Sequence, residues 1–413
     1  MRSFVLLLAL VVAFVASRPS ERQNLHGAQV LRVVPRVDTQ LHYLQGLHKL
    51  NQYDFWSEPK AIGHPVDIMA TAFQLPSLRM VMDHLNIKYQ VMIPNVAKLV
   101  REDYQARAKA PKAMDWTSYH DYDEITAWLD ELATNNPGLC KVSDVGTSYE
   151  GRTMKVLTLG TGAADNPGIF IDGGIHAREW ISPATVTYII NELVNGASST
   201  YSDLLAGVNF HFMPVINPDG YAYTFSNERL WRKTRSPQGA CTGVDPNRNW
   251  DFHWNEGGAS NNPCADTYCG PNAFSEIEMQ VVRDQINTLP NLVSYISFHS
   301  YSQLWMYPWG WTSDLPEDWQ ELDSLAQDAV NALTAVHGTS YEIGSSTNTI
   351  YLASGGSDDW AKGAGNVKFS YTVELRDTGA FGFLLPAGQI IPTGEETFQG
   401  VLVVGNFVLS YTP

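Results

Sequence analysis

The stretch GIFIDGGIHAREW, residues 168–180, joins an apolar strand to a group of chemically active side chains. Residues 168–172 are apolar on both faces, which is typical of a strand buried in a sheet that helices cover. Two glycines end the strand, and His176 and Glu179 follow within the next turn. In open α/β sheets, ligands bind just beyond the carboxyl ends of the strands. The stretch therefore predicts an α/β fold with a functional site directly after this strand.

Two later strand candidates end in the same kinds of side chain. The run 292–299 ends at His299, and the run 367–374 ends at Glu374. Further strands are expected at 154–159 and 208–215. Helices are expected at 121–133, 183–194, 276–288, 318–336 and 393–409. Alternation of strands and helices over about 300 residues predicts one large α/β domain with a mixed or mostly parallel central sheet.

His176, Glu179 and His299 together suit a catalytic zinc ion. Zn²⁺ in such sites takes three protein ligands and keeps one position for water. One carboxylate and two neutral imidazoles leave the ion electrophilic, and Glu374 can then act as general base on the water. Alone, the H-x-x-E pair also fits exposed helical neighbours, and His299 alone also fits a core histidine. The chain has no HExxH, GxSxG or P-loop motif, so the main rival hydrolase and nucleotide sites are excluded.

Charge is distributed unevenly along the 413 residues. The formal net charge of −16 makes nucleic acid and anionic membranes unfavourable partners. Residues 18–112 carry 13 basic and 8 acidic side chains, a net +5, whereas residues 113–413 carry 13 and 35, a net −22. Two segments of opposite charge are expected to attract each other.

The first 17 residues have the pattern of a secretory signal peptide. Arg2 precedes a 12-residue apolar run, residues 4–15, and small residues stand before Arg18. The run is too short to span a bilayer, and a buried N-terminal helix is the alternative interpretation. We expect a secreted protein without a membrane anchor. In an oxidising compartment Cys140, Cys241, Cys264 and Cys269 can form disulfides, but their connectivity cannot be deduced from spacing.

Residues 18–112 form a separate N-terminal segment. Their pattern predicts strands at 29–34, 66–70 and 88–93 and helices at 39–50 and 75–86, which is a small α+β open sandwich. The polar, basic residues 98–112 predict a connecting helix that ends in a protease-sensitive linker. The expected organisation is a signal peptide at 1–17, the N-terminal segment at 18–112 and the α/β domain at 113–413.

The chain resembles the secreted zinc metallocarboxypeptidases of the pancreatic A and B type in their zymogen form. The motifs that carry this resemblance are GIHAREW at 174–180, NPDGY at 217–221, LWRKTR at 230–235, DPNRNW at 245–250, FHSYSQ at 298–303 and ELRDTG at 374–379. The resemblance implies a carboxypeptidase-type α/β fold behind an activation (pro) segment, and one Zn²⁺ per chain. It also implies an activity that removes single C-terminal residues from peptides, a monomer, and activation by a trypsin-like protease after Arg107, Lys109 or Lys112.

The resemblance assigns roles to individual residues. His176, Glu179 and His299 hold zinc, Glu374 activates water, and Arg232 stabilises the oxyanion. The residues expected to bind the terminal carboxylate are Asn247, Arg248 and Tyr351, and those expected at the neighbouring subsite are Arg178, Tyr301 and Phe383. An arginine fork beside an amide suits a carboxylate. Without the motifs, the arginines would be interpreted as salt-bridge donors and the aromatic residues as core.

Substrate preference depends on Asp358. In the family this position lies at the base of the side-chain pocket, apolar in A-type enzymes and Asp in B-type enzymes, so Asp358 favours substrates ending in Lys or Arg. Gly310 and Ser346 are small and leave room for a long side chain. Alternatively, Asp358 and Asp359 serve only as capping and first-turn charges of a helix. An A-type enzyme and an inactive peptide-binding relative are the two rival functions.

The resemblance also implies covalent and backbone features. It pairs Cys241 with Cys264 and leaves Cys140 and Cys269 free. It further implies cis peptide bonds at Ser300–Tyr301 and Arg376–Asp377, next to His299 and Glu374.

Overall fold

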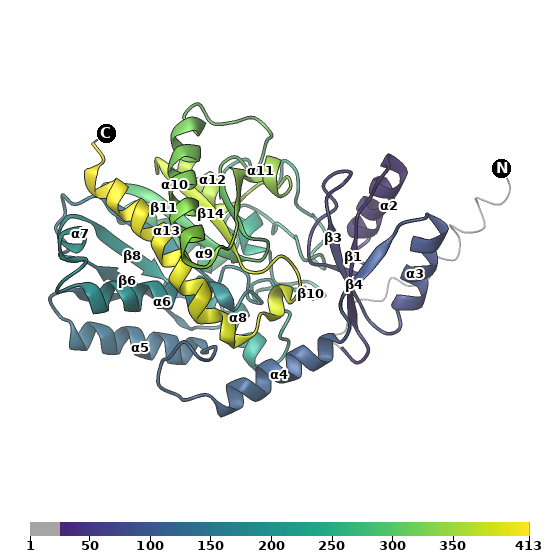
Figure 1. Cartoon of the computed structure of the whole chain (residues 1–413), viewed down its shortest axis with the longest axis horizontal. Helices are drawn as coiled ribbons and strands as arrows, with labels where there is room; N and C mark the ends of the chain where they lie inside the picture. Colours follow the sequence, from purple (N-terminus) through teal and green to yellow (C-terminus); the bar gives the residue numbers. More distant parts are fainter. Residues whose placement is uncertain (1–24, 413) are drawn as a thin grey trace.

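The computed structural model describes residues 25–412, so the predicted signal peptide lies outside the described residues. Figure 1 shows a small N-terminal lobe, coloured purple and blue, beside a much larger lobe that contains the remaining chain. Helix α4 (Val96–Lys109) connects the two lobes. Between residues 25 and 412, no helix combines the length and apolar character needed to cross a membrane.

The N-terminal lobe is a four-stranded antiparallel sheet with two helices. The strand order is β2-β3-β1-β4. Its elements are β1 (Gln29–Val33), α2 (Asp38–Lys49), β2 (Asp54–Phe55), β3 (Val66–Ala70), α3 (Leu75–His84) and β4 (Tyr89–Ile93). Because strand side chains alternate between faces, Leu31 and Ile68 pack on the two helices, whereas Val30 and Met69 face the large lobe. The predicted α+β open sandwich is confirmed, and only the short β2 was not expected.

The large lobe is built on an eight-stranded mixed sheet in the order β13-β12-β14-β11-β7-β8-β6-β5. The four central strands, β14, β11, β7 and β8, are parallel to one another. The strands are β5 (Cys140–Thr147), β6 (Thr153–Leu159), β7 (Gly168–Asp172), β8 (Asn209–Met213), β11 (Leu292–Ser300), β12 (Leu304–Tyr307), β13 (Glu342–Ser345) and β14 (Phe369–Leu375). The predicted α/β fold with a mixed sheet is confirmed.

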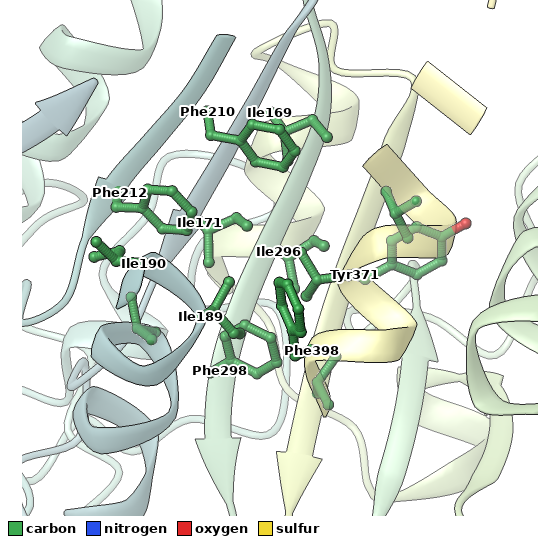
Figure 2. Close-up of a cluster of buried hydrophobic side chains, with 14 of the residues drawn as sticks. Ile169, Ile171, Ile189, Ile190, Phe210, Phe212, Ile296, Phe298, Tyr371 and Phe398 are labelled. Carbon is green, nitrogen blue, oxygen red and sulfur yellow. The ribbon is translucent and has the colours of Figure 1, made fainter. Parts of the chain in front are cut away.

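Helices cover both faces of this sheet. Figure 2 shows Ile169 and Ile171 of β7 in one apolar cluster with Ile189 of α6 and Phe398 of α13. The opposite face, which includes Phe170, packs on α9 and α12. The helices are α5 (Tyr122–Asn135), α6 (Ile181–Gly196), α7 (Ser202–Gly207), α8 (Pro218–Ser226), α9 (Ile277–Thr288), α10 (Trp319–His337), α11 (Ser346–Thr349), α12 (Ser357–Gly363) and α13 (Ile390–Ser410).

The covalent and backbone expectations agree with the structure. Cys241 and Cys264 are bonded, and Cys140 and Cys269 are free and buried. The peptide bonds Ser300–Tyr301 and Arg376–Asp377 are cis, as is Pro308–Trp309, which was not expected.

Glu278, in the first turn of α9, is a fully buried carboxylate with incomplete hydrogen bonding. Its Oε1 accepts a 2.9 Å hydrogen bond from the Tyr149 backbone N–H, but its Oε2 has no partner. Burial, together with the negative charges of Asp219 and Glu276, raises the pKa of Glu278 to about 7. The ionised form is therefore unfavourable in the folded protein.

Glu278→Gln should make the free energy of unfolding less sensitive to pH. An unfolded glutamate ionises near pH 4.3, so the wild-type protein loses stability as the pH rises from about 4.3 to about 7. Gln keeps the acceptor for Tyr149 and cannot ionise, so the variant's stability relative to wild type should be about 3–4 kcal/mol more favourable near pH 8 than near pH 4. Denaturant titrations at both pH values test this, with the exposed Glu131→Gln as control. An equal difference at both pH values would contradict it.

Candidate active site

The carboxyl ends of β7 and β11 bring three predicted ligands together. His176 and Glu179 lie in the turn after β7, and His299 lies near the end of β11. One donor atom from each side chain falls within 4.8 Å of the others, and all three side chains are buried. The Glu179 carboxylate lies 2.8 Å from Nδ1 of His176 and 3.3 Å from Nδ1 of His299. Burial alone would raise the pKa of Glu179, but the two histidines hold it below its ordinary value, which favours the ionised carboxylate.

The outer nitrogen of each histidine also has a partner. Nε2 of His176 lies 3.1 Å from Asp245, and Nε2 of His299 lies 3.3 Å from the Ser297 hydroxyl. A histidine that binds metal through one nitrogen needs a hydrogen-bond acceptor at the other. Both Nδ1 atoms therefore face the donor cluster with the support that a zinc ligand requires, and the site fits a zinc ion.

Glu374, on β14, lies beside this cluster because its residue is the register partner of His299 on β11. Its Oε2 is buried and has no hydrogen-bond partner. Burial, together with the charge of Glu179, raises the pKa of Glu374 to about 8. A cation bound between these groups would favour the ionised form. Glu374 is thus an unengaged carboxylate at the edge of the donor cluster.

Arg232 and Asp245 form a buried ion pair next to the cluster. Nε and Nη2 of Arg232 donate to Oδ2 of Asp245 at 3.1 and 2.9 Å. Asp245 is itself fully buried and also binds His176, so it links the arginine to a ligand. Burial opposes its ionisation, but Arg232 and Arg248 hold the pKa of Asp245 well below its usual range. The guanidinium of Arg232 is consequently fixed in place as a permanent cation.

Asn247 and Arg248 belong to the short 3₁₀ turn Pro246–Arg248, which begins directly after Asp245. Arg248 donates to the carbonyl oxygens of Gly258 and Asn247, which orients its guanidinium. The guanidinium carbon lies 5.8 Å from the centre of the Tyr351 ring. The three residues predicted to grip a terminal carboxylate therefore lie close together.

Arg178, Tyr301 and Phe383 form a second group. The Arg178 guanidinium stacks 4.0 Å from the centre of the Phe383 ring, and the rings of Tyr301 and Phe383 meet edge to face. All three side chains are almost fully buried. The three residues expected at the neighbouring subsite therefore lie in contact with one another.

Asp358 lies in the first turn of α12, buried and linked to the other pocket positions. The Ser346 hydroxyl donates to its carboxylate at 3.2 Å. Asp359 accepts hydrogen bonds from the backbone N–H groups of Gly310 and Trp311. Both acids occupy the first turn of a helix, as the alternative interpretation held, but their side chains also bind residues of other segments.

The N-terminal lobe covers these groups with its own acids. Asp54 lies 3.2 Å from Nη1 of Arg178, and Glu58 lies 3.4 Å from Nη2 of Arg248. Two carboxylates from one lobe therefore occupy the two arginines of the other.

Aromatic and polar contacts complete this cover. The Trp56 ring lies 5.0 Å from the Phe383 ring, and the Tyr301 hydroxyl donates to Asp67 at 2.7 Å. Asp67 also binds Arg32 of its own lobe. The N-terminal lobe thus contacts the carboxylate-binding group and the neighbouring subsite together.

The ion pairs between the segments follow the predicted charge attraction at some points and run against it at others. The basic Arg107 of α4 binds the acidic Asp121 and Glu124 at 2.8 and 2.6 Å. Elsewhere an acid of the basic segment meets an arginine of the acidic one, and Asp103 binding Arg229 at 2.9 Å is a further example. Net charge does not determine these contacts, because each depends on which side chains face each other.

Two groups of contacting residues were not predicted from the sequence. Asp245 stands within the DPNRNW motif that supplied Asn247 and Arg248, so its position was a usable signal. The covering residues Asp54 and Glu58 carry no local signal, because only the tertiary fold brings them to the arginines.

Comparison with known proteins agrees with this geometry. Residues 125–400 match the family model for zinc carboxypeptidase, and residues 31–103 match that for the carboxypeptidase activation peptide. The chain belongs to the zinc carboxypeptidase family. It is a metallocarboxypeptidase that uses Zn²⁺ and carries an activation segment, so it is the zymogen of an exopeptidase.

Individual relatives extend this comparison. Carboxypeptidase B of Astacus astacus is 71% identical over 299 residues, covering 71% of this chain and 98% of that protein. Carboxypeptidase A1 of Mus musculus is 40% identical over 414 residues, covering 97% of this chain and 99% of that protein. The crystal structure of carboxypeptidase A from Helicoverpa armigera matches with a TM-score of 0.86 at 30% identity, covering 94% of this chain and 98% of that one.

Glu58→Gln should raise the residual activity of the full-length zymogen toward short peptides. The Glu58 carboxylate occupies Arg248, where a substrate's terminal carboxylate is expected to bind, and Gln removes that competing charge. We expect about a tenfold increase, the equivalent of about 1.4 kcal/mol. Initial rates of the uncleaved variant measure it, with the exposed Glu102→Gln of α4 as control. Unchanged residual activity in Glu58→Gln would show that this contact does not block the site.

Proposed function

We propose that the active form of this protein removes Lys and Arg from the C-terminus of peptides. The observation that carries the proposal is a set of buried acids around Asp358, the residue expected at the base of the side-chain pocket. Asp358 and Asp359 are almost fully buried, and so is Asp172, whose pKa is raised to about 6 by burial together with the nearby charge of Asp358. Within residues 25–412 none of the three forms an ion pair with Lys or Arg. A basic substrate side chain supplies the missing cation.

The catalytic roles follow from the geometry of the donor cluster. His176, Glu179 and His299 hold the zinc ion, which supplies Lewis acidity toward water and a peptide carbonyl. Glu374 takes the proton of the attacking water, since its Oε2 has no other partner. Arg232 donates to the oxyanion that develops on the scissile carbonyl, and Asp245 keeps it oriented.

Substrate binding uses the two arginine groups. Arg248, Asn247 and Tyr351 bind the terminal carboxylate, which restricts the enzyme to the last peptide bond. Arg178, Tyr301 and Phe383 line the preceding subsite. In the zymogen these are the residues that Glu58, Asp54 and Trp56 cover, so the activation segment blocks the positions that a substrate must occupy.

Processing and location complete the proposal. Residues 1–17 act as a signal peptide, and the protein is secreted as a monomeric zymogen whose activation segment spans 18–112. A trypsin-like protease releases the catalytic domain, 113–413, by cutting near the end of α4. Carboxypeptidase activity toward apolar C-terminal residues is the competing outcome of the specificity experiment below.

Trypsin should cut after Lys109 or Lys112 rather than after Arg107. Arg107 lies within α4, and its side chain forms ion pairs with Asp121 and Glu124. Lys109, by contrast, ends the helix, and Lys112 is exposed beyond it. A protease needs a free basic side chain and an accessible backbone. N-terminal sequencing of the activated enzyme should find Ala110 or Ala113. The exposed Arg101→Gln should leave the pattern unchanged, and a new N-terminus at Ala108 alone would contradict the proposal.

Asp358→Asn and Asp358→Ile should reverse the substrate preference of the activated enzyme. Loss of the buried charge removes about 3 kcal/mol of pairing, so kcat/KM for Arg-terminal peptides should fall about 10²-fold. Activity on matched Phe- or Leu-terminal peptides should rise, because the carboxylate that disfavours apolar side chains is gone. Peptides that differ only in their last residue measure the ratio.

Two variants serve as controls for this experiment. Asp314→Asn removes an exposed negative charge and should leave the Arg-to-Phe ratio unchanged. Glu374→Gln should abolish both activities while zinc stays bound. An unchanged ratio in the Asp358 variants would refute the basic preference and favour apolar specificity.

A further inference from the structure

Asp172 is a fully buried carboxylate at the end of β7 that binds two hydroxyl groups and no cation within residues 25–412. The Tyr295 hydroxyl donates to its Oδ2 at 2.5 Å, and the Ser297 hydroxyl donates to its Oδ1 at 2.7 Å. A place among the acids around the pocket would not by itself require these two hydroxyl groups to point at Asp172.

Sheet geometry places Asp172 in line with a zinc ligand. Ser297 on β11 is the register partner of Asp172 on β7. Side chains two residues apart on a strand point to the same face, so Tyr295, Ser297 and His299 share one face of β11. The Ser297 hydroxyl lies between the carboxylate and Nε2 of His299, at 2.7 Å from the first and 3.3 Å from the second.

The positions of the protons follow from the donors available. A serine hydroxyl has one proton to donate, and a carboxylate can only accept. Because the Ser297 hydroxyl donates its one proton to the hydrogen bond with Asp172, its oxygen can only accept a hydrogen bond from Nε2 of His299. A neutral His299 must therefore carry its single proton on Nε2, which leaves the lone pair on Nδ1. Nδ1 is the nitrogen that faces His176 and Glu179, at 3.2 and 3.3 Å.

Without the Asp172 carboxylate, the direction of these hydrogen bonds is no longer fixed. The Ser297 hydroxyl could then donate to Nε2, which would place the imidazole proton on Nδ1. A protonated Nδ1 has no lone pair for a metal. We propose that Asp172 is a positioning residue that fixes the metal-binding tautomer of His299 through Ser297.

The other histidine ligand, His176, has a carboxylate in direct contact with its outer nitrogen. Asp245 lies directly against Nε2 of His176, at 3.1 Å. Each imidazole thus has a buried carboxylate behind it, one in contact and one through a hydroxyl. The charge of Asp245 is balanced by Arg232, whereas Asp172 has no such cation, so its ionised form is supported by the hydroxyl groups and by the zinc ion itself.

Zinc affinity of the full-length protein tests the proposal. Asp172→Asn and Ser297→Ala should each weaken zinc binding about 10- to 100-fold, measured by competition with a chromogenic chelator. Tyr295→Phe is the matched control, since it removes a hydrogen bond to the same carboxylate but leaves the Ser297 link, and it should change the affinity less than about threefold. The double variant Asp172→Asn/Ser297→Ala should be no weaker than the weaker single variant, because two members of one relay do not act independently.

Imidazole ¹⁵N shifts of the metal-free protein give a second measurement that does not depend on zinc. The wild-type His299 should carry its proton on Nε2, and Ser297→Ala and Asp172→Asn should shift the population toward Nδ1. Unchanged zinc affinity in both variants, additive losses in the double variant, or an unchanged tautomer would each overturn the proposal. If Asp172→Asn does not fold, Ser297→Ala and its tautomer decide the outcome. Failure of the proposed Lys and Arg preference appears only in peptide ratios, so the two results are distinguishable.

Discussion

The parallel register of β7, β11 and β14 is the constraint on which the active site depends. It places Asp172 beside Ser297 and His299 beside Glu374, and the turn after β7 returns His176 and Glu179 to the same edge. Parallel strands need long crossover connections, which helices such as α6 and α9 provide while they bury both faces of the sheet. The apolar layers in Figure 2 therefore hold the catalytic groups in register.

This arrangement leaves buried charges that the isolated protein only partly balances. Asp245 is neutralised by Arg232 and Arg248, but Glu374 and the acids around the pocket have no such partner within the described chain. An unpaired buried charge is costly, so such a site favours ligands that supply the opposite charge. Zinc does so at one end of the site, and a basic substrate side chain is proposed to do so at the other.

The sequence predicted the strands, helices and ligands that have strong local patterns. The apolar run before GIHAREW, the ends of β11 and β14, and the long amphipathic α10 were all identified correctly. The strands β5, β12 and β13 were missed. β12 and β13 have four residues each, too few to show a period, and β5 lies at the sheet edge, where its alternation of buried and exposed residues is weak.

The contacts of the activation segment were beyond prediction for a different reason. Nothing in the local sequence around Glu58 or Asp54 indicates an arginine partner, because each pair joins residues more than 100 positions apart. The opposite net charges predict an attraction between the two segments, and such a field acts over distances of about 8 Å in physiological salt. Contact geometry, by contrast, is determined by individual side chains.

Net charge acts at long range and individual side chains act at contact, and this difference explains why acids of a basic segment occupy the site. In the proposed mechanism Arg248 binds the substrate carboxylate and Arg178 lines the preceding subsite, and buried guanidinium groups without a partner are unfavourable. A covering segment that carries carboxylates supplies an acid to both Arg248 and Arg178, and at Arg248 this is the group that a substrate is proposed to supply. On the proposed roles, blocking the site and stabilising its cationic groups are one interaction, and removal of the activation segment by proteolysis would leave those groups free for substrate.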